Sequence, residues 1–177
     1  MGEPSSIAIV GAGTVGTALG VLAGGRGWTV AAVADHDAQR ATAAAARIGC
    51  AARAPAEAAG SAELVLLTVP DDAIAAMAGE LAAAGAFRRG AVVAHCSGAL
   101  GSDVLAPARD ECGCAIASMH PLQTFPTVDA AVARLGGAFY FCEGHDAALS
   151  ALWPLVTDLG GQFVPIHPAA KTRSEEH

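Results

Sequence analysis

The sequence predicts an α/β protein built on a doubly wound, mostly parallel sheet, and three features of its pattern support this prediction. Short apolar runs alternate along the chain with longer segments in which apolar residues recur at helical spacing. Most of the short runs are apolar throughout, as expected for strands that are buried on both faces of a parallel sheet. A glycine-rich segment, Gly11 to Gly16, lies directly between the first apolar run and the first helical segment.

The composition limits the classes of protein that need to be considered. The chain has 177 residues, of which 53% are hydrophobic and 15% are charged, so we expect one well-buried domain and no extensive disorder. Its net charge is −7 and no basic patch is present, which argues against a nucleic-acid partner. No uninterrupted apolar segment is long enough to span a membrane, and the first residues lack the positive charge of a signal peptide. We therefore expect a cytoplasmic protein with no membrane partner.

The cysteine content indicates neither a disulfide framework nor a metal site. Five cysteines are present, and no CxxC pair occurs among them. Cys112 and Cys114 are the closest in sequence, but no second pair accompanies them, so we predict no metal ligands. Reduced thiols packed as small hydrophobic side chains are the expected state.

The first element is a strand from Ser6 to Val10, which leads into the segment GAGTVG and a helix from Thr14 to Gly25. In a segment of this kind Gly11 permits a tight turn, and Gly13 lets the backbone approach a pyrophosphate. Gly16 allows the new helix to pack closely, while amides at the helix N-terminus bind phosphate oxygens. A preceding strand, a following helix and an acidic residue about 20 positions on are the context that a dinucleotide-binding GxGxxG requires. We therefore predict a Rossmann NAD(P)-binding fold in which the cofactor binds to Gly11, Ala12, Gly13, Thr14, Val15 and Gly16.

The second strand, from Trp28 to Ala34, is followed by Asp35, about 20 residues after the glycine segment. A carboxylate at this position binds the ribose hydroxyls of adenosine and would repel the 2′-phosphate of NADP, so NAD is the favoured cofactor. Two alternatives stay open. Asp35 or Asp37 can instead cap the next helix, and both roles are compatible if Asp37 is the cap. Arg40, and His36 if it is protonated, keep NADP possible.

Three short elements follow: a helix from Asp37 to Ile48, a strand around residues 50–52 and a helical turn from Pro55 to Gly60. The next strand runs from Leu64 to Val69 and is ended by Pro70, and Asp71 or Asp72 is expected to cap the following helix. In a doubly wound sheet the carboxyl end of this strand lies beside the cofactor. We predict that Val69, Pro70 and Asp71 flank the cofactor, although a strand followed by a capped helix would explain the same residues.

The strand from Ala91 to Ala94 ends in HCSGAL, which begins at His95. This turn concentrates an imidazole, a thiol and a hydroxyl at the carboxyl end of a strand, where ligands of open α/β sheets bind. We predict that the turn contacts substrate or nicotinamide, with Ser97 and His95 orienting the substrate. The alternative is that His95 is a half-buried histidine whose ring is satisfied by backbone groups.

A second histidine lies at the end of the following strand. After a helical stretch from Ser102 to Asp110, the strand from Cys114 to Met119 ends in His120 and a proline-containing loop. Two imidazoles on neighbouring strand ends can face one cleft. Histidine is the usual proton donor or acceptor near neutral pH, which hydride transfer to a C=O or C=N bond requires. We predict that His120 is the catalytic acid or base, and a hydrogen-bonded loop anchor is the alternative.

The last part of the chain has the pattern of one more strand, helix and strand. We expect these elements at Ala138 to Cys142, Asp146 to Leu159 and Gln162 to Ile166. The predicted inner face of the helix consists of Leu149, Leu152, Trp153 and Val156. Pro154 is expected to kink this helix or to delay its start. The dinucleotide-binding domain would then cover residues 1–168, and residues 169–177 would form a polar, disordered tail.

Four motifs together give the chain a resemblance to a known family. GAGTVG, VPDDAI, HCSGALGSDVL and SMHPLQTF are similar to segments of the Rossmann-like proteins that carry a C-terminal helical domain of unknown function. These proteins are relatives of 6-phosphogluconate dehydrogenase, pyrroline-5-carboxylate reductase and prephenate dehydrogenase. The first two motifs are shared by many such enzymes, whereas the last two, at this spacing, are more specific. The resemblance extends from Ile7 to about Lys171.

This resemblance implies an NAD(P)-dependent oxidoreductase with a small-molecule substrate, in which Ser97, Gly98 and His120 face the substrate. It identifies no particular substrate, because the chemistry of the family is largely unassigned. The relatives continue beyond the position of Lys171 into an all-helical domain that helps to form a dimer and closes the substrate cleft. A homodimer is expected if that domain is present.

Two classes of function therefore follow from the sequence. The first is an NAD(P)-dependent oxidoreductase that acts on a small C–O or C–N substrate. The alternative is a non-catalytic module that binds or senses a dinucleotide and lacks its catalytic helical domain. A flavin or an adenylated cofactor on the same glycine segment is a weaker possibility. No GxxxxGK[ST] motif is present, so ATP hydrolysis is unsupported.

Overall fold

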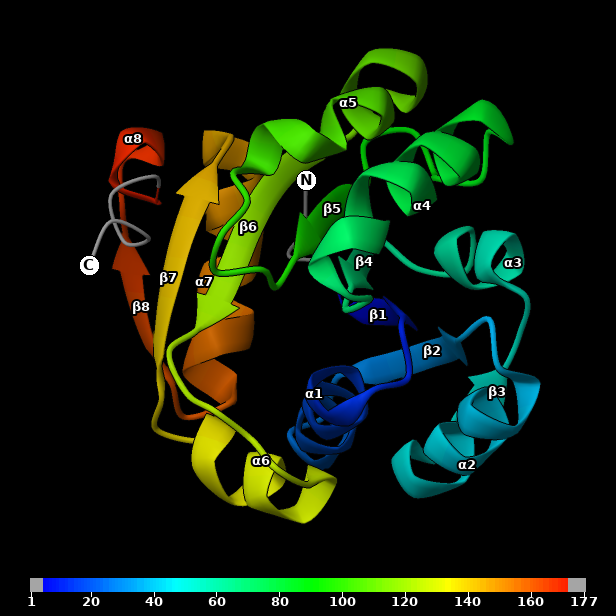
Figure 1. Ribbon diagram of the computed structural model, residues 1–177, viewed down its shortest axis with the longest axis vertical. Helices are drawn as coiled ribbons and strands as arrows, with labels where there is room; N and C mark the ends of the chain where they lie inside the picture. The colour runs from blue at the N-terminus through cyan, green and yellow to red at the C-terminus, as the bar shows by residue number, and fades with distance from the viewer. Residues whose placement is uncertain (1–4, 172–177) are drawn as a thin grey trace.

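The computed structural model describes residues 5–171, which form one eight-stranded sheet with helices on both faces (Figure 1). The strands are β1 (Ser6–Val10), β2 (Thr29–Ala34), β3 (Ala51–Ala52), β4 (Leu64–Leu67), β5 (Val92–His95), β6 (Ala115–Pro121), β7 (Phe139–Gly144) and β8 (Gln162–Pro165). The helices are α1 (Thr14–Gly25), α2 (Ala38–Ile48), α3 (Pro55–Ala59), α4 (Asp71–Ala83), a 3₁₀ helix η1 (Ser102–Leu105), α5 (Ala106–Cys112), α6 (Val128–Leu135), α7 (Asp146–Asp158) and α8 (Pro168–Lys171).

The strand order is β3-β2-β1-β4-β5-β6-β7-β8. The chain builds outwards from β1 to one edge, then returns to the other side of β1 with β4, so the winding reverses between β1 and β4. All pairings in the sheet are parallel except that of β6 with β7. The prediction of an α/β fold with a doubly wound, mostly parallel sheet is confirmed. In such sheets, ligands bind at the carboxyl ends of the strands beside the point of reversal.

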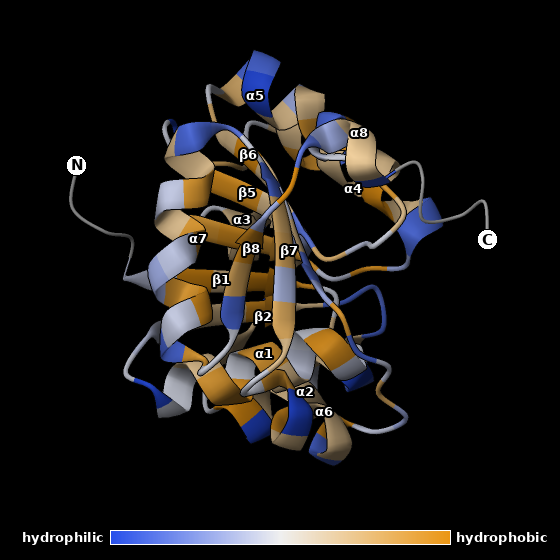
Figure 2. Ribbon diagram, turned by 90° about the vertical axis from the view of Figure 1, so that its left-hand side faces the viewer, coloured by the Kyte–Doolittle hydropathy of each residue, from blue (hydrophilic) through white to orange (hydrophobic). Residues whose placement is uncertain are grey.

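Alternation along the central strands divides the apolar side chains between two cores. Leu64 and Leu66 of β4 belong to the core formed with α1, α6 and α7, whereas Val65 and Leu67 belong to the core formed with α4 and α5. The central strands are accordingly the most hydrophobic part of the molecule, and hydrophilic residues gather on the outer faces of the helices (Figure 2). This burial on both faces explains why the strand sequences are apolar throughout.

Three features of the C-terminal half differ from the expectations. Helix α6 was not predicted, although Thr127 caps it by accepting a hydrogen bond from the amide of Ala130 at 3.1 Å. Pro154 lies inside α7 and does not delay its start. The placement of Trp153 on the inner face is wrong, since its side chain is 56% exposed. The buried face of α7 runs instead through Leu152, Leu155 and Val156, and Trp153 lies just outside that face.

The predicted disordered tail begins too early. Pro168–Lys171 form α8, and Lys171 is buried because its ammonium group has acceptors inside the protein. The rest of the predicted tail, residues 172–177, lies outside the described residues. Within residues 5–171, no helix is long and apolar enough to cross a membrane.

Truncation of Leu66 to alanine tests the packing of the central sheet. Leu66 is 1% exposed in β4, so Leu66→Ala should lower the free energy of unfolding by about 2–5 kcal/mol. The matched substitution Leu122→Ala, at a side chain that is 54% exposed, should change it by less than about 0.5 kcal/mol. Urea unfolding followed by circular dichroism measures both changes. Equal effects of the two substitutions would contradict the placement of β4 in the core.

Candidate functional site

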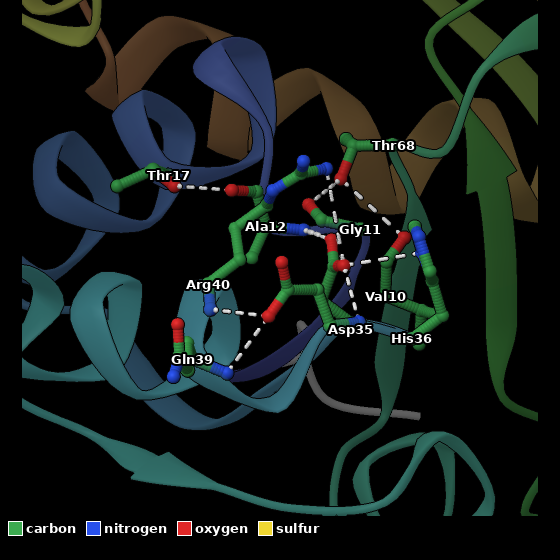
Figure 3. A network of polar contacts seen from close by, with 10 residues as sticks. Val10, Gly11, Ala12, Thr17, Asp35, His36, Gln39, Arg40 and Thr68 are labelled. Carbon is green, nitrogen blue, oxygen red and sulfur yellow. Dashed lines mark hydrogen bonds and ion pairs between the residues drawn. The ribbon is translucent and has the colours of Figure 1, made fainter.

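The glycine segment lies between β1 and α1, directly against the end of β4 (Figure 3). Gly11 has a φ of +118°, and a β-carbon there would lie 2.5 Å from the backbone carbonyl carbon of Thr68. A β-carbon on Gly16 would overlap the carbonyl oxygen of Gly11. These two positions need glycine for conformational and packing reasons. Gly13 differs, because a β-carbon there would meet no atom within 4 Å, so its missing side chain leaves open space.

Hydrogen bonds within the protein fix the shape of the loop. The amide of Gly11 donates to the carbonyl oxygen of Ala34 at 2.8 Å, and the Thr68 hydroxyl donates to the carbonyl oxygen of Gly11 at 2.6 Å (Figure 3). The Thr17 hydroxyl donates to the carbonyl oxygen of Ala12 at 3.3 Å. Contacts from the end of β2, the end of β4 and α1 therefore hold the loop in place.

Asp35 follows β2, and its carboxylate points into the glycine loop (Figure 3). It accepts hydrogen bonds from the amides of Ala12 at 2.8 Å and Asp37 at 2.9 Å, and its side chain is 5% exposed. Two exposed basic groups lie beside it, Nδ1 of His36 at 3.2 Å and Nη1 of Arg40 at 3.9 Å. Asp35 therefore fixes the start of the loop relative to the end of β2.

Asp37, and not Asp35, is the N-cap of α2. Its carboxylate accepts hydrogen bonds from the amides of Gln39 and Arg40, as the sequence allowed. These bonds stabilise the ionised carboxylate and lower the pKa of Asp37. The capping function is thus met without Asp35, which leaves Asp35 for the loop and for a ligand beside it.

The connection from β4 to α4 departs from its prediction in detail. β4 ends at Leu67, and Pro70 occupies the N-cap position of α4. The expected aspartate cap is wrong, because Asp71 and Asp72 lie in the first turn and no side-chain cap bond forms. Their negative charges favour that turn through the helix dipole. Val69 is half-buried, whereas Pro70 and Asp71 are exposed.

The strand register places the candidate residues along one edge of the sheet. Val10 of β1 pairs with Leu67 of β4, Leu67 with His95 of β5, and His95 with Ser118 of β6. The loops that follow these parallel strands therefore emerge side by side. At about 4.8 Å per strand, the distance from β1 to β6 is about 14 Å. The glycine loop, Val69–Asp71, the HCSGAL turn and the end of β6 share this edge in that order.

His95 is fully buried, and both of its ring nitrogens contact the backbone. Nε2 lies 3.0 Å from the carbonyl oxygen of Gly101, and Nδ1 accepts a hydrogen bond from the amide of Ser97 at 3.1 Å. A carbonyl only accepts, so the ring proton resides on Nε2. Burial lowers the pKa of His95 to about 4, so the ring is neutral at pH 7. This geometry matches the alternative in which backbone groups satisfy the ring, and it stabilises the turn.

The turn itself contains a buried serine and a cysteine that stays protonated. The Ser97 hydroxyl oxygen accepts hydrogen bonds from the amides of Ala99 and Leu100, each at 3.1 Å. Burial raises the pKa of the Cys96 thiol to about 12, which keeps it from acting as a thiolate nucleophile at neutral pH. All five cysteines are free thiols, and no group of three or more potential metal ligands occurs within residues 5–171.

His120 lies across this turn from the end of β6. Its Nδ1 is 3.1 Å from the carbonyl oxygen of Cys96, so in the neutral ring Nδ1 holds the proton and Nε2 is the acceptor. A β-carbon on Gly98 would lie 2.7 Å from Nε2, which shows how closely the ring covers this glycine. Burial lowers the pKa of His120, so the neutral ring predominates at pH 7. The structure thus brings Ser97, Gly98 and His120 together, with His95 buried behind them.

Two buried charged residues were not predicted from the sequence. Lys171 is 4% exposed, and its ammonium group donates to the carbonyl oxygens of Ser97 and Leu100 at 2.9 and 2.7 Å. Glu143 is 1% exposed, and its carboxylate accepts from the amide and hydroxyl of Ser102 at 2.6 and 2.8 Å. Both bind the segment that follows β5. The one signal in the sequence was that Lys171 is the only lysine.

A glycine loop at the reversal of the strand order, with an acid at the end of β2, defines the dinucleotide-binding class of open α/β sheets. A family model described as Rossmann-like domain matches residues 3–121. The chain belongs to this Rossmann-like domain family. No curated protein matches the chain.

Several solved structures share the fold. Arogenate dehydrogenase from Synechocystis has a TM-score of 0.79 and 18% identity, with 94% of this chain and 61% of that chain covered. Prephenate dehydrogenase from Aquifex aeolicus has a TM-score of 0.75 and 15% identity, with coverage of 94% and 63%. Pyrroline-5-carboxylate reductase from Coxiella burnetii has a TM-score of 0.72 and 13% identity, with coverage of 94% and 60%.

Because these sequence identities are low, the matches show a shared fold and nothing more. The chain spans about 60% of the length of these neighbours. The resemblance drawn from the four motifs is confirmed, since prephenate dehydrogenase and pyrroline-5-carboxylate reductase are both among the structural neighbours.

The protonation of His95 gives a direct test of the turn geometry. We expect His95 to titrate near pH 4, with the proton of the neutral ring on Nε2. Imidazole ¹H–¹⁵N correlation spectra recorded across the pH range report both properties. A titration near the ordinary value of 6.5 would contradict the buried, backbone-bonded position.

The lowered pKa of His95 also predicts how the free energy of unfolding depends on pH. Between about pH 6.5 and 4 the unfolded chain binds a proton at His95 and the folded chain does not, so the free energy of unfolding should fall as the pH falls. The variant His95→Gln should show a flatter dependence over this window. Urea unfolding at pH 7 and pH 5 measures the difference, and identical slopes in both proteins would refute the assignment.

Proposed function

We propose that this chain binds a nicotinamide dinucleotide, with NAD favoured over NADP, along the carboxyl edge of the sheet. The observation that supports this most directly is the open space at Gly13 within a loop that is otherwise fixed by Gly11, Gly16 and Asp35. Gly13 is the N-cap residue of the 12-residue helix α1 and has no side-chain cap of its own. Phosphate oxygens would receive hydrogen bonds from the first amides of that helix, favoured by its dipole.

The proposed ribose site is Asp35. Its carboxylate is already oriented by the Ala12 amide, and a carboxylate oxygen can accept further hydrogen bonds from ribose hydroxyls. A 2′-phosphate at this position would meet a negative charge that is 5% exposed. Arg40 and His36 lie beside it and would offset part of that repulsion, which is why the preference needs measurement.

The nicotinamide half would lie farther along the edge, past β4. Val69, Pro70 and Asp71 would flank it there, and the turn after β5 would follow. When bound, the nicotinamide would give or accept a hydride. The residues of this chain would orient the substrate and move a proton: His120 at Nε2, with Ser97 beside it. His95 would maintain the shape of the turn, since both of its ring nitrogens are engaged by the backbone.

The proposed reaction is the oxidation or reduction of a small C–O or C–N bond. The solved neighbours are named dehydrogenases and reductases, which supports a redox reaction without specifying the substrate. Dinucleotide binding without catalysis is the second candidate, and it needs only the residues described above.

Gly13 offers a substitution that tests binding without disturbing the fold. Because a β-carbon at Gly13 meets no protein atom within 4 Å, Gly13→Val should fold normally yet block the pyrophosphate and weaken NADH binding about 100-fold or more. Gly25→Val is the matched control, since Gly25 is equally open, and should leave binding unchanged. Fluorescence titration with NADH measures both. Tight binding by Gly13→Val would show that the loop assignment is incorrect.

The preference for NAD can be tested at Asp35. Wild type should bind NADH more tightly than NADPH, and Asp35→Asn should move the ratio of the two dissociation constants toward NADPH by about five- to tenfold. Asp37→Asn removes the same charge from a neighbouring exposed position and keeps a good helix cap, so it should leave the ratio nearly unchanged. A wild-type preference for NADPH would refute the ribose role of Asp35.

A further inference from the structure

Lys171, at the end of α8, is buried among acceptors that come from a distant part of the chain. Its ammonium group donates to the carbonyl oxygens of Ser97 and Leu100 and to the hydroxyl oxygen of Ser118. A lysine ammonium has three N–H donors and no acceptor, so these three bonds use its full capacity. Such complete pairing is what a lysine that is only 4% exposed requires.

The acceptors of Lys171 belong to the two segments that hold His120. Ser118 lies two residues before His120 in β6, so the two side chains project from the same face of the strand. The turn after β5 contacts the ring at the Cys96 carbonyl oxygen, through Nδ1, and at Gly98, beneath Nε2. Ser97, which Lys171 binds, lies between these two contact points.

We propose that Lys171 is a positioning residue for His120: its ammonium group fastens the Ser97–Leu100 turn to β6 and thereby fixes Nε2 of His120 over Gly98. This inference rests on the proposed function, in which His120 moves the proton. Glu143 supports the same arrangement from β7, because its carboxylate holds Ser102, which follows the turn. The ammonium group of Lys171 and the carboxylate of Glu143 thus bind one short segment from two sides.

The positive charge of the ammonium group also favours the neutral, proton-accepting form of the His120 ring. The backbone carbonyl of Cys96 and the Asp71 carboxylate from α4 act on the ring of His120 and raise its pKa. The neutral His95 ring also lies nearby. Burial has the largest effect in lowering the pKa of His120, and the positive charge of Lys171 acts in the same direction. The ring therefore serves as a proton acceptor at neutral pH. For oxidation of a substrate, the O–H or N–H proton would move to Nε2 of His120, and accepting the hydride from the substrate carbon, with its electron pair, is the chemistry that a bound oxidised nicotinamide would supply.

The first test compares Lys171→Met with Lys171→Arg. Methionine removes the charge and the hydrogen bonds, so the pKa of His120 should rise, while arginine should keep it near the wild-type value. Imidazole NMR spectra measure the pKa of His120 in each protein. A folded Lys171→Met variant with an unchanged His120 pKa would overturn the proposal.

A second measurement uses the wild-type protein and so does not depend on a variant that folds. Because Lys171 is the only lysine, labelling with ¹⁵Nζ-lysine gives one side-chain signal. That signal should show slowed hydrogen exchange and should shift as His120 titrates, and the shift should disappear in His120→Gln. A signal that behaves as an exposed lysine, without response to His120, would also overturn the proposal.

Titration of wild type with NADH separates this inference from the proposed function. NADH binding depends on the glycine loop, whereas the pKa of His120 is measured without cofactor, so the two results are independent. Absence of NADH binding in every protein would contradict the proposed function, while the coupling between Lys171 and His120 would still be measured in the same samples.

Discussion

The contact between Gly11 and the end of β4 is the constraint on which the rest of the site depends. Gly11 has a positive φ and leaves no room for a β-carbon beside Thr68, whose hydroxyl binds the Gly11 carbonyl oxygen. This contact directs the chain into α1 so that the open position, Gly13, forms its N-cap. Asp35 then holds the Ala12 amide from the other side. Contacts within the protein therefore fix the N-terminal end of α1.

At the other end of the carboxyl edge of the sheet, buried charged side chains fix the turn after β5. Bonds to its own amides and to the rings of His95 and His120 hold the turn after β5. Lys171 and Glu143 fasten it to neighbouring strands, and a burial this complete is tolerated only because each charged group has its hydrogen-bond partners. The two ends differ in kind, because backbone geometry shapes the glycine loop, whereas paired charges shape the segment around His120.

Local pattern was sufficient for much of this fold. Apolar runs identified the strands because their burial on both faces leaves a continuous signal, and GxGxxG identified the loop because backbone geometry demands glycine there. Features set by long-range packing were missed. The helical periodicity put Trp153 on the buried face of α7, but the buried residue is its neighbour Leu152. Lys171 follows a short segment whose sequence gives no indication of its distant hydrogen-bond acceptors. The hydrogen bond from Nε2 of His95 to the carbonyl oxygen of Gly101 likewise depends on the path of the chain after β5, which the sequence pattern does not give.

Amide chemical-shift mapping with NAD⁺ tests the central claim most directly. On titration of ¹⁵N-labelled protein, the largest changes should fall on the amides of Gly11 to Gly16 and on Asp35, with smaller changes after β4 and β5. A hollow lined by Leu149, Trp153 and Phe163 lies on α7 and β8, five strands along the sheet from β1, and no change is expected there. Changes confined to that hollow, or none at millimolar NAD⁺, would contradict the account.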